Sequence, residues 1–236
     1  MDISLQFRDE SLASTDFEQI LTRIGAVTNE MAGINAKFSN WLAQGDSLDE
    51  ARLYPAFEDG KPSTALLAML KERFRKDSST TYVALWDGNE SQNEGATLAC
   101  HVGDKFLPDS FEVNLYDESS LGDVDSVQRV VRTAIAIFSP AYVSVAPRAY
   151  AERQVFDDKP GVGWMLYLPK VLTVQQVPEA RALIPVPEAG KKQTGTIIVS
   201  VTDAVFSVDN PEHVEIANRI EIRLVDQDLL PRYSDI

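Results

Sequence analysis

The sequence has only one cysteine, Cys100, and two histidines, His101 and His213, among its 236 residues. A single cysteine cannot form an intramolecular disulfide or a thiolate metal cluster. The histidines lie far apart and share no metal-ligand spacing. Adjacent residues of a strand point to opposite faces, so Cys100 and His101 do not form a catalytic pair. We therefore expect no bound metal and no cofactor, and a reducing compartment fits this composition.

Basic residues are also few. The chain carries 22 Lys and Arg against 36 Asp and Glu, which gives a formal net charge of −14 at pH 7. Nucleic-acid binding needs clustered Lys and Arg to neutralise phosphates, so a nucleic-acid partner is not expected. An excess of acid suits a basic protein partner, or it simply keeps the protein in solution, and the charge alone leaves both interpretations open.

Long hydrophobic runs are missing. No apolar stretch approaches the roughly 18 residues that a membrane-spanning helix needs. The first residues, MDISLQF, have neither the basic start nor the apolar core of a secretory signal. We therefore expect a cytoplasmic protein without a membrane partner.

The glycine loops that bind phosphate are not found either. The stretch GVGWMLYLPK at 161–170 holds Gly161 and Gly163, but Leu166 stands where the dinucleotide fingerprint needs a third glycine. An apolar strand follows these glycines, whereas the fingerprint requires a helix. The chain also has no Gly-Lys-Ser or Gly-Lys-Thr motif and no Gly-x-Ser-x-Gly motif. The stretch is interpreted as a glycine turn leading into a buried strand that carries Trp164.

The hydrophobic periodicity predicts helices and strands that are interleaved without regular β-α-β alternation. This pattern favours the α+β class, with a mixed, mainly antiparallel sheet and helices packed on it. We expect one domain over residues 1–236, with a possible long loop at 178–192. The helices are expected at 17–34, 47–53, 63–74, 123–138 and 210–229, and the strands at 3–7, 38–42, 80–86, 95–102, 110–116, 142–146, 164–168 and 196–201.

The three strands between residues 80 and 116 alternate two kinds of side chain. One set is apolar and should face the helices, and the other mixes aromatic and polar groups, as protein interfaces do. This second set forms either a partner-binding face or a second buried face with solvated loops. The apolar set is Val83, Leu85, Leu98, Cys100, Val102, Phe111, Val113 and Leu115, and the mixed set is Tyr82, Trp86, Thr97, His101, Glu112, Asn114 and Tyr116.

Acidic residues are concentrated in the same region. Residues 81–125 contain ten Asp and Glu, and Lys105 is the only basic residue among them. Clustered charge of one sign, next to exposed aromatic residues, indicates a surface for a partner of opposite charge. The predicted partner-binding residues are Trp86, Asp87, Glu90, Glu94, Asp104, Asp109, Glu112, Tyr116, Asp117 and Glu118.

Paired carboxylates leave an alternative open, because any of them could bind a divalent cation. Such pairs are also common in solvated turns. The sequence from Pro108 to Glu112 is similar to a fragment of a metal-dependent nuclease, but Asn114 stands where that motif has lysine. A metal-dependent hydrolase therefore remains one alternative function, and an acidic adaptor for another basic protein is a second. The pairs are Asp117 and Glu118, Asp123 and Asp125, Asp157 and Asp158, and Asp226 and Asp228.

Several segments resemble a known family. These are FSNWLAQGDSLDEARLYPAF, YVALWDG, GVGWMLYLPK, VPEARALIPV, GTIIVSV and NPEHVEIANRIEIRLVDQDLLPR. Together they resemble the immunity protein 52 family of bacterial polymorphic toxin systems. The resemblance implies an α+β cytoplasmic protein, without catalysis, that binds and neutralises a cognate secreted toxin. It also implies that the toxin is a restriction-endonuclease-like nuclease, often delivered by type VI secretion.

Overall fold

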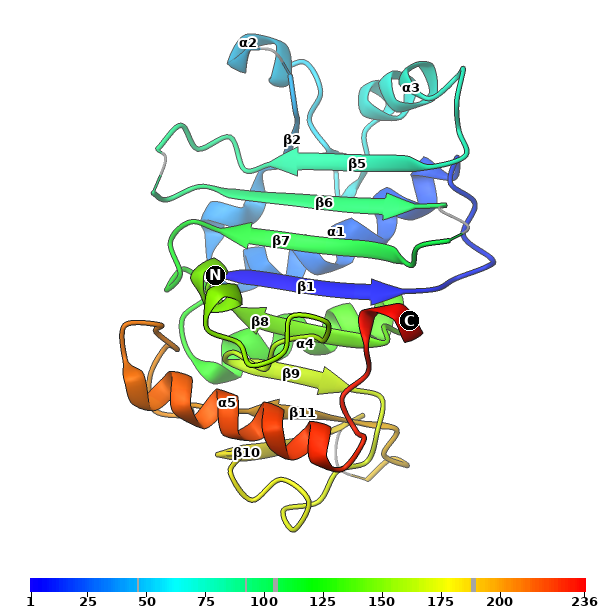
Figure 1. Ribbon diagram of the computed structural model, residues 1–236. Helices are drawn as coiled ribbons and strands as arrows, with labels where there is room; N and C mark the ends of the chain where they lie inside the picture. The colour runs from blue at the N-terminus through cyan, green and yellow to red at the C-terminus, as the bar shows by residue number, and fades with distance from the viewer. Residues whose placement is uncertain (46, 92, 104–105, 188–189) are drawn as a thin grey trace.

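The computed structural model describes residues 1–45, 47–91, 93–103, 106–187 and 190–236. Its main feature is a nine-stranded sheet in the order β10-β11-β9-β8-β1-β7-β6-β5-β2, whose neighbouring strands pair antiparallel (Figure 1). The expected α+β class is thus confirmed. The strands are β1 (Asp2–Phe7), β2 (Leu42–Ala43), β5 (Thr81–Trp86), β6 (Ala96–Val102), β7 (Asp109–Leu115), β8 (Tyr142–Ala146), β9 (Met165–Leu168), β10 (Ala182–Val186) and β11 (Gly195–Val199), and β3 (Phe57–Glu58) and β4 (Lys61–Pro62) form a separate hairpin.

Side-chain caps fix the starts of the four longer helices. Asp16, Ser63, Asp123 and Asn210 each accept a backbone N–H from the first turn, which satisfies a donor that has no partner inside the helix. These starts agree with the expected ones. The helices are α1 (Phe17–Ile34), α2 (Leu48–Ala51), α3 (Thr64–Arg73), α4 (Val124–Phe138) and α5 (Pro211–Asp226), with short 3₁₀ helices η1 (Ala36–Ser39), η2 (Arg148–Glu152) and η3 (Tyr233–Asp235).

Two expected segments differ from the structure. The strand expected at 38–42 overlaps the end of helix η1, because the Asn35 side chain accepts the Lys37 N–H and turns the chain there. Only Leu42–Ala43 forms a strand. The stretch 178–192, expected as a long loop, contains β10, which pairs with β11 at the edge of the sheet. Proline is tolerated on an edge strand, where no partner needs its N–H, and so Pro185 fits there.

Helices α1 and α4 cover the back of the sheet (Figure 1). The apolar sets of β1, β5, β6 and β7 point toward them, and every member of the predicted apolar set is buried. Phe7 and Phe111 both pack against Phe138 of α4, with ring centroids 5.0 Å apart in each pair. The prediction that this set faces the helices is therefore confirmed. In the described part of the chain, no helix is both long and apolar enough to cross a membrane.

Helix α5 covers the front of the sheet over β9 and β11 (Figure 1). Strand β9 is buried on both faces as a result, and Trp164 just before it is 0% exposed. The Trp164 indole N–H donates to the carbonyl of Val201 at 2.9 Å. Gly163 has a φ of +49°, and a side chain there would collide with Ala146. The interpretation of this stretch as a glycine turn before a buried strand is confirmed.

A buried carboxylate attaches the segment 147–163 to α5. Glu221 is 1% exposed. Its Oε1 accepts the Tyr150 hydroxyl at 2.7 Å and the Val162 N–H at 2.9 Å, and its Oε2 accepts the Val155 N–H at 2.8 Å. Burial raises the pKa of Glu221, and the three hydrogen bonds oppose that rise. A single side chain thus satisfies two backbone donors and one hydroxyl between two segments.

Replacement of Trp164 tests the two-sided burial of β9. Trp164→Ala should lower the free energy of unfolding by about 3–5 kcal/mol, because it leaves a cavity and an unpaired Val201 carbonyl. Trp86→Ala, on a half-exposed ring, should cost clearly less. Urea unfolding followed by circular dichroism measures both, and equal losses would contradict this assignment of β9 to the core.

Glu221 should also make stability depend on pH. Its pKa in the folded protein lies above the ordinary 4.5, so the folded state binds this proton more tightly than the unfolded state does. The wild type should therefore lose stability relative to Glu221→Gln as the pH rises from about 4.5 through the folded pKa. Urea titrations of both proteins between roughly pH 4 and 7 measure the difference. If the difference in free energy of unfolding between the two proteins stayed constant with pH, or came to favour the wild type as the pH rose, the pKa of Glu221 would not be raised.

Candidate functional site

One half of the front of the sheet is open. In the described part of the chain, none of the five α-helices lies in front of β1, β5, β6 and β7, and only the short helix η2 reaches the start of β1 (Figure 1). We call the side chains that point forward from these four strands the open face. All of them are half-buried or exposed, in contrast to the buried set behind them. They are Asp2, Ser4, Gln6, Tyr82, Ala84, Trp86, Thr97, Ala99, His101, Ser110, Glu112 and Asn114.

The open face contains the predicted mixed set. Tyr82 is 39% exposed, and Tyr116, which directly follows β7, is 49% exposed. The alternative of a second buried face is therefore wrong for this half of the sheet. Cys100 lies on the other side of β6, and burial raises the pKa of its thiol to about 12. Its exposed neighbour His101 belongs to the open face, so the two side chains do not act as a pair.

The strand register arranges the open face in rows that cross the strands. At one end, Trp86 lies opposite Thr97, which in turn lies opposite Asn114. At the other end, Tyr82 lies opposite His101, and their ring centroids are 5.7 Å apart. These two rows are separated by about 13 Å, the length of four strand residues. The face thus has an aromatic group near each end.

Acidic loops gather beside the Trp86 row. The connection from β5 to β6 and the one from β7 to α4 meet there, since the Tyr116 N–H donates to the Gly95 carbonyl at 3.0 Å. Lys37 also spans both loops, 3.3 Å from the Glu94 carbonyl and 3.5 Å from the Asp117 carboxylate. The structure therefore brings together, around this end and the adjacent strands, Trp86, Asp87, Glu90, Glu94, Glu112, Tyr116, Asp117 and Glu118.

Two predicted residues do not join this group. Asp109 begins β7 at the opposite end of the sheet and belongs to the set that faces the helices. Its carboxylate accepts the Gly103 N–H at 2.8 Å, so it fixes the turn between β6 and β7. The predicted set was chosen by the density of acidic residues along the sequence. Successive turns of a meander lie at opposite ends of its strands, so residues that are close in sequence were placed together although the fold separates them. Asp104 lies outside the described residues.

The carboxylates gathered here differ in their exposure and in their hydrogen bonds within the protein. Asp87 is 9% exposed, and it accepts the Asn89 N–H, while burial raises its pKa. Asp117 accepts the hydroxyl and the N–H of Ser119, and these bonds lower its pKa. Glu118 lies 3.7 Å from the N-terminal amine. Asp87 and Asp117 therefore shape turns, while the exposed carboxylates of Glu90, Glu94 and Glu112 are free to face a partner.

Sequence reasoning did not find the residues that β1 and η2 bring to the open face. Strand β1 inserts between β7 and β8, so Asp2 and its alternate neighbours join residues more than 100 positions away. Arg148 of η2 lies 3.2 Å from the Asp2 carboxylate and donates to the Asn114 side chain. The period-two pattern of β1 indicated a polar face, but no local signal gave its neighbours.

Among the described residues, the carboxylate pairs are not joined by further metal-binding side chains. Among the residues that the structure describes, no group of three or more His, Cys, Asp or Glu side chains could hold a metal ion. Asp117 and Glu118 lie instead next to Lys37 and the N-terminal amine.

The fold and this face define an α+β protein with one half-open antiparallel sheet. The chain belongs to the immunity protein 52 family, whose family model (Imm52) matches residues 12–232. No match was found among curated proteins. Among solved structures, the chain is similar to the Pseudomonas aeruginosa T6SS protein PA0821, with 10% sequence identity and a TM-score of 0.46 over 93% of this chain and 72% of that chain.

Tryptophan fluorescence tests the exposure of the open face. Trp41 and Trp164 are at most 3% exposed, whereas Trp86 is half-buried. Acrylamide should therefore quench mainly Trp86, and Trp86→Phe should remove most of the quenchable emission. If the variant retained the wild-type quenching, Trp86 would be buried and the face would be covered.

Proposed function

We propose that this chain binds and neutralises a cognate secreted toxin in the cytoplasm of the producing cell, and that the open face with its acidic loops is the contact surface. The family supports an immunity role. The observation that carries the choice of surface is a half-open sheet face with exposed Tyr82 and Tyr116, bordered at one end by acidic loops. The proposed mechanism is binding alone, with no catalytic step.

The toxin that best fits this surface is a basic nuclease with a restriction-endonuclease-like fold. A nuclease presents basic groups to phosphates and holds a divalent cation at its active site. An acidic protein of net charge −14 complements such a cleft and competes with the nucleic acid for it. Fast capture has a clear benefit here, because one uninhibited nuclease molecule can damage the genome.

The dimensions of the face indicate that strands and loops act together. Four strands about 4.8 Å apart and about 20 Å long present roughly 400 Å². A stable interface buries about 800 Å² on each partner. The remaining area would come from the loops at 87–95 and 116–123, which border the Trp86 row. Tyr116 sits at the junction of the two parts, which is the usual position of an energetic anchor.

Neutralising exposed acids should slow association. We expect the triple variant Glu90→Gln, Glu94→Gln and Glu112→Gln to bind the toxin encoded by the neighbouring gene with a lower association rate and a weaker salt dependence. A matched control, Asp203→Asn with Asp209→Asn and Asp226→Asn, removes the same charge from the half of the sheet that α5 covers. Stopped-flow kinetics at two salt concentrations compare them. If both triple variants slowed association equally, the effect would come from net charge alone and not from the open face.

Removing an anchor should speed dissociation. Tyr116→Ala should weaken binding by about 2 kcal/mol, or roughly 30-fold, mainly through the dissociation rate. Tyr233→Ala, on a tyrosine 38% exposed near the C-terminus, is the control. Surface-plasmon kinetics measure both variants. If Tyr116→Ala bound the toxin normally, and changes to acids near Asp157 or Asp226 weakened binding instead, the interface would lie in the carboxy-terminal half.

A further inference from the structure

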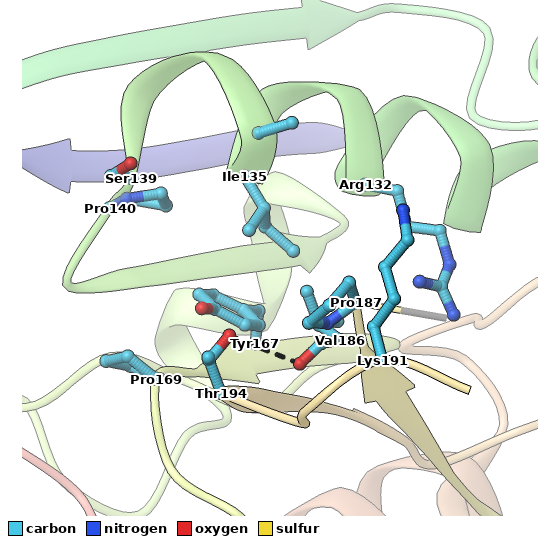
Figure 2. A pocket seen from close by; sticks show the side chains of 11 residues that line it. Arg132, Ile135, Ser139, Pro140, Tyr167, Pro169, Val186, Pro187, Lys191 and Thr194 are labelled. Atoms are coloured by element: carbon cyan, nitrogen blue, oxygen red, sulfur yellow. Dashed lines mark hydrogen bonds between the residues drawn. The ribbon is translucent and has the colours of Figure 1, made fainter. Parts of the chain in front are cut away.

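A groove of about 530 Å³ lies between the second half of α4 and the segment that follows β10 (Figure 2). Tyr167 and Val186 line it from the sheet. Both belong to the set of β9 and β10 that faces α4, so the groove is on the opposite side of the sheet from the open face. Its volume falls within the roughly 300–1,000 Å³ of small-molecule sites.

One end of the groove is positively charged. Figure 2 shows the Lys191 side chain extending toward α4 beside Arg132. Arg132 Nη2 donates to the Pro185 carbonyl at 2.9 Å. This bond holds the guanidinium in place, and Nη1 keeps two further donors. Among the described residues that line the groove, none is acidic, although the whole chain has a large excess of acid.

The other end offers neutral hydrogen-bond donors. Tyr167 is 5% exposed, yet its hydroxyl makes no hydrogen bond with any residue that the structure describes. Figure 2 shows this hydroxyl on the side of the ring toward Pro169. Burial raises the pKa of Tyr167, which keeps the phenol protonated and able to donate. The hydroxyl lines the groove without a protein partner among the described residues, so a ligand atom that accepts a hydrogen bond can reach it there.

The middle of the groove is apolar, and the end of α4 makes its two ends electrostatically different. Ile135 and Ala136 line it from the helix, with Pro140 and Pro187 at its borders. Helix α4 ends at Ser139, whose N–H donates to the Ile135 carbonyl. The carbonyl end of a helix carries partial negative charge, so an anion is disfavoured there and is directed to the Arg132 end.

We propose that this groove binds a small amphipathic carboxylate. The carboxylate lies at Arg132 and Lys191, an apolar body lies against Ile135 and Ala136, and a hydrogen-bond acceptor at the far end meets the Tyr167 hydroxyl. A phosphate dianion suits the groove less well. It would need more donors than two cations on one side, and the net negative charge of the chain would repel it more strongly.

The first test uses 4-hydroxybenzoate, which carries a carboxylate and a hydroxyl at opposite ends of a ring. Isothermal titration should show saturable binding with one site. The neutral analogue 4-hydroxybenzamide should bind about tenfold more weakly or not at all, because it lacks the charge. Benzoate, without the far hydroxyl, should bind several-fold more weakly. No saturation by 4-hydroxybenzoate, or equal binding of the amide, would overturn the proposal.

The second test places the ligand in this groove. Lys191→Gln should weaken 4-hydroxybenzoate binding about tenfold, whereas the control Lys192→Gln, one exposed position along, should leave it unchanged. Tyr167→Phe should weaken 4-hydroxybenzoate but not benzoate, since only the former uses the hydroxyl. Thermal unfolding confirms that each variant is folded. Equal effects of the two lysine variants, or an equal effect of Tyr167→Phe on both ligands, would show that the ligand binds elsewhere.

Discussion

The buried carboxylate of Glu221 is the interaction on which the asymmetry of this protein depends. A buried charge is costly unless hydrogen bonds compensate it, and Glu221 accepts three. Two of the donors are backbone N–H groups of the segment 147–163, and the buried N–H of Val162 would otherwise have no partner. This arrangement holds α5 and that segment against the β9 half of the sheet. Among the described residues, no α-helix covers the other half of the same face.

The two halves of the sheet have sequences that match their surroundings. Strands β9 and β11 are buried on both faces, and α5 covers them in front. Strands β5, β6 and β7 alternate strictly, with buried residues toward α1 and α4 and mixed residues toward the open face. A strand buried on one side only provides a rigid support for exposed side chains. The proposed toxin contact uses this support, and the groove beside α4 lies on the opposite side of the sheet.

Much of the local structure could be predicted from the sequence. Each long helix begins at a capping residue such as Asp16 or Asn210, and the period-two pattern correctly separated the two faces of the meander. Strand order could not be predicted, because the pairing of β1 with β7 and β8 joins residues more than 100 positions apart. For that reason Arg148 was missed and Asp109 was grouped with acids at the wrong end. The groove was missed for the same reason, since helix α4, strand β9 and the segment after β10 build it together.

The central claim is that the open face is the surface that meets the toxin. Hydroxyl-radical footprinting of the chain, free and in complex with the toxin, tests it most directly, because oxidation reports the solvent exposure of individual side chains. The account predicts that Tyr82, Trp86, His101 and Tyr116 lose reactivity in the complex, while Tyr233 keeps it. Protection of Tyr233 and of α5 residues, with Tyr82, Trp86, His101 and Tyr116 unchanged, would contradict it.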